Sequence, residues 1–201
     1  MNIYLTRHSQ TEWNLVRRIQ GFLDSPLTKK GINDAKKLRD RLKDIEIDTA
    51  YTSTQGRALR TTEIVMEGKR ERIVTSEALR ELGVGNWQGM YYEDIIKNHP
   101  EQFELYTTKP HIYEPDNEGE TFLEFEKRVK DFVEFLKKQS GENVLIVTHG
   151  LTYMMLLNLF ENKPLENLTD RKVPLGTALA KIEYLDGEFN ILYEGDDKHL
   201  F

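Results

Sequence analysis

Five side chains that could bind and transfer a phosphoryl group are spread along the sequence. They are Arg7, His8, Arg57, Glu81 and His149. Guanidinium groups form paired hydrogen bonds to phosphate oxygens, and a neutral imidazole can attack phosphorus to give a covalent intermediate. A carboxyl group can give a proton to a leaving oxygen. Each residue by itself could lie in a solvated loop, so the elements that carry them decide whether they form one site.

Apolar segments alternate with helical patterns along the chain, which predicts an α/β fold. We expect strands at residues 2–6, 47–52, 72–75 and 143–148, and helices at 28–42, 55–68, 121–141 and 151–159. Val144 to Val147 are apolar without alternation, as in a central parallel strand that is buried on both faces. Asp186-Gly187 predicts a hairpin between strands at 178–185 and 188–193.

These elements predict a three-layer α/β/α sandwich with a mostly parallel central sheet, in a single domain over residues 1–201. Thr121 to Glu124 form a capping box, and Gly141 is the expected end of the helix that it opens. Residues 86–120 are rich in aromatic side chains and prolines. We expect this region to be a small cap insertion of short helices and loops.

The five candidate residues follow different strands of the predicted sheet. Arg7 and His8 follow the first strand, and Arg57 follows the second. Glu81 follows the third strand, and His149 follows the central one. Ligands of an open parallel sheet bind at the carboxyl ends of its strands, where the connecting loops converge. The arrangement therefore favours one anion site at this edge over scattered loop charges.

The composition restricts the classes of protein and partner. The 201 residues include no cysteine, which excludes a disulfide framework, a thiolate metal site and a cysteine nucleophile. A formal charge of −6, with acids and bases mixed, argues against a nucleic-acid partner. The N-terminus does not read as a signal peptide, and the most apolar stretch, residues 153–160, is too short to span a bilayer. We expect a cytoplasmic protein without a membrane partner, and a homodimer remains open.

A metal hydrolase with His8, Glu81 and His149 as ligands is the competing chemical interpretation. The sequence has no His-x-His or His-Glu-x-x-His spacing. Two neighbouring arginines would also oppose the binding of a divalent cation. We therefore predict that the site uses no metal and no cofactor.

A collinear set of motifs runs through nearly the whole chain. Residues 6–14 read TRHSQTEWN, and further motifs lie at 18–21, 24–31, 52–62, 79–89, 119–128 and 148–150. The first resembles the Arg-His-Gly-x-Ser/Thr-x-Trp-Asn signature of the histidine phosphatase superfamily, the phosphoglycerate mutase-like proteins, and the others are similar to its later motifs. Residues 83–89 resemble the phosphatase branch, which includes broad-specificity phosphatases and α-ribazole phosphatase.

The resemblance implies a metal-independent phosphatase of the histidine acid type, which hydrolyses a small-molecule phosphomonoester through a covalent phosphohistidine. His8 would be the nucleophile, and Glu81 would protonate the leaving alcohol and then activate water. Arg7, Arg57 and His149 would hold the phosphoryl group. The remaining positions expected to bind phosphate or substrate are Thr11, Asn14, Gln20, Gly21 and Gly150.

Two residues depart from the family pattern. Ser9 stands where most members have glycine, and its added side chain could crowd or hydrogen-bond the phosphate or simply be tolerated. Gln88 stands where related phosphatases often have glutamate. Every proposed catalytic group is nevertheless present.

Phosphoglycerate mutase and a non-catalytic phosphate-binding protein are the alternatives to a phosphatase. A mutase must bind a second, carboxylate-bearing phosphate, which favours a basic cap. Between residues 86 and 124 the only lysines and arginines are Lys97 and Lys109, against nine acidic residues. Because the nucleophile and the acid are both retained, a non-catalytic protein is also disfavoured. The sequence therefore predicts a phosphatase.

Overall fold

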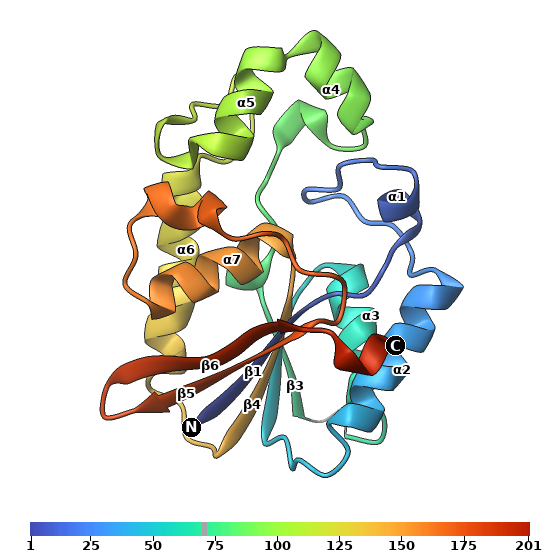
Figure 1. Ribbon diagram of the computed structural model, residues 1–201, viewed down its shortest axis with the longest axis vertical. Helices are drawn as coiled ribbons and strands as arrows, with labels where there is room; N and C mark the ends of the chain where they lie inside the picture. Colours follow the sequence, from blue (N-terminus) through green and yellow to red (C-terminus); the bar gives the residue numbers. More distant parts are fainter. Residues whose placement is uncertain (70–71) are drawn as a thin grey trace.

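The computed structural model describes residues 1–69 and 72–201, and at its centre lies a six-stranded sheet (Figure 1). The strands are β1 (Asn2–Arg7), β2 (Thr49–Ser53), β3 (Ile73–Ser76), β4 (Asn143–Thr148), β5 (Leu179–Leu185) and β6 (Glu188–Asp196). Their order in the sheet is β3-β2-β4-β1-β5-β6. The first four are mutually parallel, and β5 and β6 are antiparallel. The predicted mostly parallel sheet is confirmed, and the hairpin extends it beside β1.

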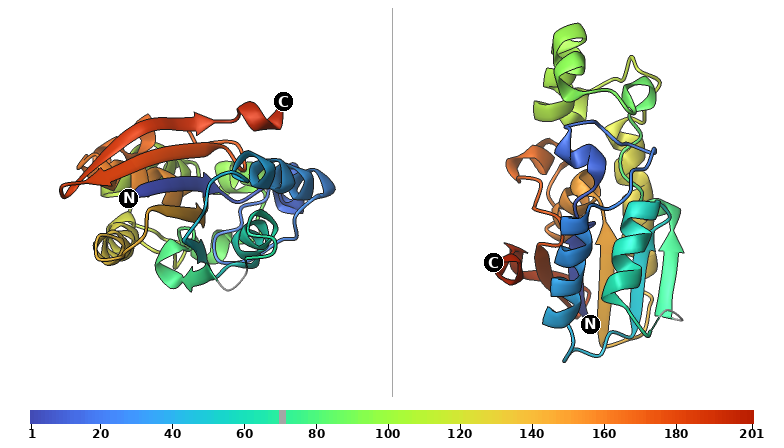
Figure 2. Two further views of the ribbon diagram at one scale, coloured as in Figure 1. Left: turned by 90° about the horizontal axis from the view of Figure 1, so that it is seen from below. Right: turned by 90° about the vertical axis from the view of Figure 1, so that its right-hand side faces the viewer.

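Helices cover both faces of the sheet, as the views in Figure 2 show. They are α1 (Glu12–Leu15), α2 (Lys29–Arg41), α3 (Gly56–Val65), α4 (Tyr92–Asn98), α5 (Pro100–Thr108), α6 (Phe122–Leu136) and α7 (Gly150–Phe160). Successive strand residues point to opposite faces. In β1, Ile3 and Leu5 therefore join a core with α6 and α7, while Tyr4 joins a second core with α2 and α3. The predicted three layers are confirmed.

The central strand β4 has the position that its composition predicts. It lies between β1 and β2, and Val144 aligns with Ile3 on one side and with Thr49 on the other. Val144 to Val147 are buried, because both faces of the strand are covered by helices. His149 follows directly, so this strand places its histidine at the middle of the sheet edge.

The helix boundaries agree with the capping signals at two sites and disagree at a third. The Thr28 side chain accepts a hydrogen bond from Gly31 N at the start of α2, and Thr121 with Glu124 forms the predicted capping box of α6. The predicted end of α6 at Gly141 is wrong. The helix ends at Leu136 with Lys137 as its C-cap, and Gly141 (φ +143°) belongs to the turn before β4.

Residues 85–120 contain α4, α5 and the short 3₁₀ helices η3 (Gly85–Trp87) and η4 (Pro110–Ile112). This segment lies beyond the carboxyl ends of the parallel strands (Figure 1). Its aromatic side chains pack mostly on one another: Trp87 is buried against Phe103, Tyr106 and Tyr113. Most of these rings therefore form a local core, and only a few reach the cavities described below.

The described residues also include the short 3₁₀ helices η2 (Glu77–Leu79), η5 (Leu165–Asp170) and η6 (Lys198–Leu200). Among the described residues, no helix is long and apolar enough to cross a membrane.

Candidate active site

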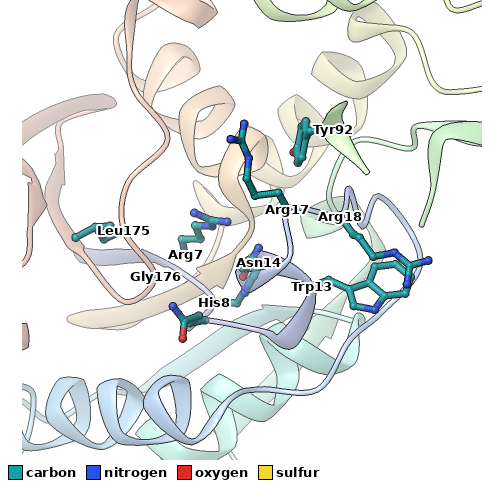
Figure 3. Close-up of a pocket in the computed structure, with 10 residues that line it drawn as sticks. Arg7, His8, Trp13, Asn14, Arg17, Arg18, Tyr92, Leu175 and Gly176 are labelled. Carbon is teal, nitrogen blue, oxygen red and sulfur yellow. The ribbon is translucent and has the colours of Figure 1, made fainter. Parts of the chain in front are cut away.

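Two adjoining cavities lie at the carboxyl edge of the parallel strands. The inner pocket has a volume of about 60 Å³, and the outer pocket has a volume of about 370 Å³. The inner pocket is lined by Arg7, His8, Asn14, Gln20, Gly21, Arg57, Glu81, Tyr92 and Tyr106, among others. The outer pocket, drawn in Figure 3, is lined by Arg7, His8, Gln10, Trp13, Asn14, Arg17, Arg18, Tyr92, Leu175 and Gly176. The two share Arg7, His8, Asn14, Arg18 and Tyr92.

The contacts of the His8 ring define which nitrogen carries the proton and which carries the lone pair. The ring is buried, and Nδ1 lies 2.7 Å from the carbonyl oxygen of Ser9. Because a carbonyl only accepts, Nδ1 carries the proton, and the hydrogen bond at Nδ1 orients the ring. Nε2 carries the lone pair of the ring and accepts a hydrogen bond from Arg57 Nε over 3.3 Å, and both residues line the inner pocket. Nε2 is therefore the nitrogen that can attack phosphorus.

The surroundings keep both site histidines neutral. Burial lowers the pKa of His8 well below its usual value, and the nearby Arg57 and Arg7 guanidinium groups lower it further. Burial and Arg57 likewise hold the pKa of His149 well below its usual value. A neutral imidazole retains the lone pair that nucleophilic attack requires.

Arg57 is fixed by a set of oxygen acceptors. Its Nη1 donates to the carbonyl oxygen of Leu23 over 2.8 Å and to Asp24 Oδ1 over 3.1 Å, and its Nη2 donates to the Gly21 carbonyl over 3.0 Å. Asp24 also accepts from the backbone N–H of Arg57 near the start of α3. A negative charge at a helix N-terminus is favourable, so Asp24 stabilises both the helix start and the guanidinium.

Arg7 and His149 have buried nitrogen atoms without partners. Arg7 Nη1 donates to the carbonyl oxygen of Pro174 over 3.0 Å, but its Nε has no hydrogen-bond partner among the residues that the structure describes. Both ring nitrogens of His149 also lack a hydrogen-bond partner among the described residues. The centroid of this ring lies 5.2 Å from that of the His8 ring. Buried polar groups are normally hydrogen-bonded. Arg7 Nε and the one N–H of the neutral His149 ring are donors that suit a ligand with several acceptor oxygens.

Glu81 is the acidic group of the inner pocket, and its carboxylate is held at the start of α7. Oε2 accepts from Leu151 N over 3.3 Å, while Oε1 accepts from its neighbour Leu82 N over 3.1 Å and from Thr152 Oγ1 over 3.4 Å. The carboxylate is therefore fixed in orientation while it lines the pocket that contains His8.

The backbone around Glu81 is clamped from α6 by Arg128. Its guanidinium donates to the carbonyl oxygens of Ala78, Arg80 and Glu81 over 2.8–3.0 Å. It also forms a bidentate ion pair with Glu120, over 2.6 and 2.8 Å. Bidentate arginine–carboxylate pairs are geometrically specific. The pair therefore orders the segment that carries the acid.

The other residues predicted to bind phosphate or substrate are placed in different ways. Asn14, Gln20 and Gly21 line the inner pocket. Thr11 lines neither pocket; its hydroxyl caps α1 by accepting from Asn14 N and donates to Gln20 Oε1 over 3.3 Å. Gly150 also lines neither pocket and begins α7 beside Glu81. His149 lines neither pocket, although its ring centroid lies 5.2 Å from that of His8.

The two departures from the family pattern have defined contacts. Ser9 is buried, and its hydroxyl lies 3.1 Å from Thr61 Oγ1 on α3. The hydroxyl is thus engaged by α3, and Ser9 lines neither pocket. The Gln88 side chain accepts from the backbone N–H of Phe22 and so ties residues 85–89 to the loop after α1.

The structure also identifies contributors that sequence reasoning had not singled out. Asp24 and Gln55 position the site; Gln55 donates to the Gly21 carbonyl and accepts from Glu81 N over 2.8 Å. Arg17 and Tyr92 line the outer pocket. Asp24 lies within residues 24–31, which are similar to a family motif, so the sequence could have marked Asp24 as a site residue. No local pattern marks the other three, because their roles arise from contacts between distant segments.

The competing interpretation makes His8, Glu81 and His149 metal ligands. Across residues 1–69 and 72–201, no group of three or more histidine, aspartate or glutamate side chains is placed to hold a metal ion.

The histidine phosphatase superfamily (branch 1) model matches residues 3–197. The chain therefore belongs to this superfamily, and the predicted family is confirmed. Phosphoserine phosphatase 1 from Hydrogenobacter thermophilus is 32% identical over 150 residues, which are 74% of this chain and 71% of that protein. Relatives whose names refer to phosphoglycerate mutase also match.

Solved structures have the same fold. Bacillus stearothermophilus YhfR is 40% identical, with a TM-score of 0.92 over 100% of this chain and 99% of that chain. The α-ribazole phosphatase from Shigella flexneri is 25% identical, with a TM-score of 0.89 over 98% of this chain and 97% of that chain. The similarity to a phosphatase of that kind agrees with the branch predicted from residues 83–89.

Proposed function

We propose that the protein hydrolyses small-molecule phosphomonoesters through a covalent phosphohistidine on His8. One observation carries this proposal. His8, whose unprotonated Nε2 accepts from Arg57, lines the same small pocket as Arg7, Arg57 and Glu81. A nucleophile, cationic hydrogen-bond donors and a carboxyl group are the parts that phosphoryl transfer needs.

In the first step, His8 Nε2 forms a bond to phosphorus while the bond from phosphorus to the alcohol oxygen breaks. Glu81 gives its proton to that oxygen, so the alcohol leaves neutral. The positive charge that develops on the imidazole is stabilised through Nδ1–H, which already donates to Ser9. Arg7 and Arg57 stabilise the charge on the phosphoryl oxygens.

In the second step, the Glu81 carboxylate takes a proton from water, and the water oxygen attacks phosphorus. The N–P bond breaks, inorganic phosphate forms, and His8 returns to its neutral state. The unpartnered Nε of Arg7, which lines the inner pocket, suits the phosphoryl oxygens throughout both steps, and the His149 ring beside His8 can supply one further N–H. The mechanism uses no metal.

We also propose that residues 1–201 act as one domain in which residues 86–120 form a cap over the substrate. Two observations support a cap. The segment lies beyond the carboxyl strand ends, and Tyr92 and Tyr106 from it line the inner pocket. The leaving group would occupy the outer pocket between this cap and Leu175.

The nucleophile is tested by an assay of a panel of phosphomonoesters with His8→Ala, in the presence and absence of EDTA. We expect His8→Ala to abolish turnover, and EDTA to have no effect. His111→Ala is a matched control, because His111 is exposed and lines neither pocket. Activity that survives in His8→Ala would remove the nucleophile, and activity lost with EDTA would contradict the metal-free mechanism.

The acid is tested by Glu81→Gln, with Glu77→Gln as an exposed control. An alkyl leaving group needs protonation, whereas p-nitrophenolate needs little. We expect Glu81→Gln to reduce the rate on alkyl phosphates far more than the rate on p-nitrophenyl phosphate. Equal losses on both substrates would show that Glu81 is not the proton donor.

The mutase alternative is tested by the interconversion of 2- and 3-phosphoglycerate in the presence of 2,3-bisphosphoglycerate. Efficient interconversion would replace hydrolysis as the principal activity. Binding of inorganic phosphate without turnover of any monoester would instead favour a non-catalytic protein.

A further inference from the structure

The outer pocket has a charge that the phosphoryl group alone does not require. Among residues 1–69 and 72–201, it is lined by three arginines, Arg7, Arg17 and Arg18, and by no aspartate or glutamate. The acidic side chains of residues 86–124 are absent from this lining, although their number had suggested an acidic cap. The surface that a leaving group would meet is therefore cationic, which favours an anionic ligand.

The three arginines differ in how far other contacts occupy them. Arg7 donates to Pro174 and lines the inner pocket as well. Arg18 donates to the Gly89 carbonyl over 2.6 Å, and its guanidinium lies 4.4 Å from the centre of the Trp13 ring. Within the described part of the chain, no ion pair and no side-chain hydrogen bond involves Arg17. Arg17 is thus the arginine of the outer pocket that is available to a ligand.

The position of Arg17 is set by its backbone. It has φ +54°, in the left-handed region, which costs an ordinary residue roughly 1 kcal/mol and which glycine or asparagine adopts more easily. Its carbonyl oxygen accepts from Tyr92 N over 3.0 Å at the start of α4. Local strain of this kind concentrates at functional sites. Because glycine or asparagine would adopt this backbone conformation more easily, the conformation does not explain why residue 17 is an arginine.

Arg17 and Tyr92 reach the outer pocket from two segments that this hydrogen bond joins. In Figure 3 the Arg17 side chain extends toward Tyr92 and away from the Arg18–Trp13 pair. Arg17 is exposed and Tyr92 is partly buried, so a ligand can reach both. A guanidinium beside a phenol hydroxyl can bind a carboxylate with several donors.

We propose that Arg17, assisted by Tyr92, selects phosphomonoesters whose alcohol carries an anionic group, in the first place a carboxylate. The proposal rests on the proposed hydrolysis at His8 and adds the substrate class. The phosphoryl group occupies the inner pocket, and the alcohol extends into the outer pocket with its carboxylate against Arg17. Arg17 is then a specificity residue that takes no part in the transfer of the phosphoryl group.

The test compares two three-carbon esters, the phosphate ester of 3-hydroxypropanoate and propyl phosphate, which differ in the carboxylate. We expect the wild-type kcat/KM to be about tenfold higher for the carboxylate ester, the value of one charge-assisted hydrogen bond. Arg17→Asn should remove this preference, because it should lower kcat/KM for the carboxylate ester about tenfold more than kcat/KM for propyl phosphate. Asparagine suits the left-handed backbone, so the variant should fold.

Two further variants and a third substrate sharpen the result. Arg17→Lys keeps the charge and should retain part of the preference. Arg39→Ala removes a partly exposed arginine of α2 that lines neither pocket, and it should not change kcat/KM for either ester. The bisphosphate of 1,3-propanediol distinguishes a second phosphate from a carboxylate as the preferred anion.

The outcomes separate the two proposals. If the wild type hydrolyses both esters with equal kcat/KM, or if Arg17→Asn lowers both values equally, the role of Arg17 is contradicted while hydrolysis at His8 stands. If the wild type hydrolyses neither ester nor any other monoester, the proposed function fails and the substrate class fails with it.

Discussion

Acid pH should destabilise this protein through two buried histidines, His8 and His149. Burial, together with Arg57 and Arg7, lowers the pKa of both well below the usual value. In the unfolded chain each would titrate near pH 6.5. The folded state therefore binds fewer protons than the unfolded state below about pH 6.5. Stability is complete above that pH and falls as the pH drops toward the lowered folded-state pKa values.

The magnitude follows from the protons that folding excludes. If a histidine stays neutral in the folded protein, the free energy of unfolding is lower by about 1.4 kcal/mol at one pH unit below the unfolded pKa of that histidine. For His8 and His149 together, the loss between pH 8 and pH 5.5 is about 3 kcal/mol. Because a folded domain is stable by only about 5–15 kcal/mol, this loss is large enough to measure.

The assay is urea unfolding at a series of pH values, for the wild type and for the variant with both His8→Asn and His149→Asn. His199, whose pKa burial also lowers, is present in both proteins, so its contribution cancels. We expect the wild type to lose about 3 kcal/mol more than the variant between pH 8 and pH 5.5. An equal loss in the two proteins would refute the conclusion that these histidines are neutral in the folded state.

Two substitutions outside the reacting groups test how the site is held. Arg128→Met leaves the partly buried Glu120 unpaired, so we expect the free energy of unfolding in urea to fall by about 3 kcal/mol. Because the same change displaces Glu81, kcat should fall more on alkyl phosphates than on p-nitrophenyl phosphate. A return of the ratio of the two kcat values toward that of the wild type in Arg128→Lys would support the role of Arg128 in positioning Glu81. Equal losses of kcat on both substrates would contradict that role. Ser9→Gly removes the contact with Thr61 and should lower stability by about 1 kcal/mol without changing kcat; a fall in kcat would show that the hydroxyl acts on the phosphate.

The sequence was most informative where one residue reports a local environment. The unbroken apolar run before His149 predicted a central buried strand, and the structure has β4 in that position. Thr121 and Glu124 predicted a helix start through reciprocal hydrogen bonds, which are present. The end of the same helix was misplaced because Gly141 marks a turn that follows several residues later.

Features that depend on distant contacts could not be predicted in this way. Asp24 contacts Arg57 from 33 residues away, and Gln55 links two loops that meet only in the folded protein. The helix α1 was missed because four residues give no periodic pattern. The cationic lining of the outer pocket was missed for a similar reason. Arg17 lies outside the residues 86–124 whose charges had been counted.

The central claim is that a covalent bond forms between the protein and phosphorus during hydrolysis. The stereochemical course at phosphorus tests it most directly, with a monoester made chiral by oxygen isotopes and sulfur. Two successive in-line displacements, first by His8 and then by water, each invert the configuration, so the account predicts net retention. Net inversion would mean that water attacks the substrate directly and would contradict the phosphohistidine mechanism.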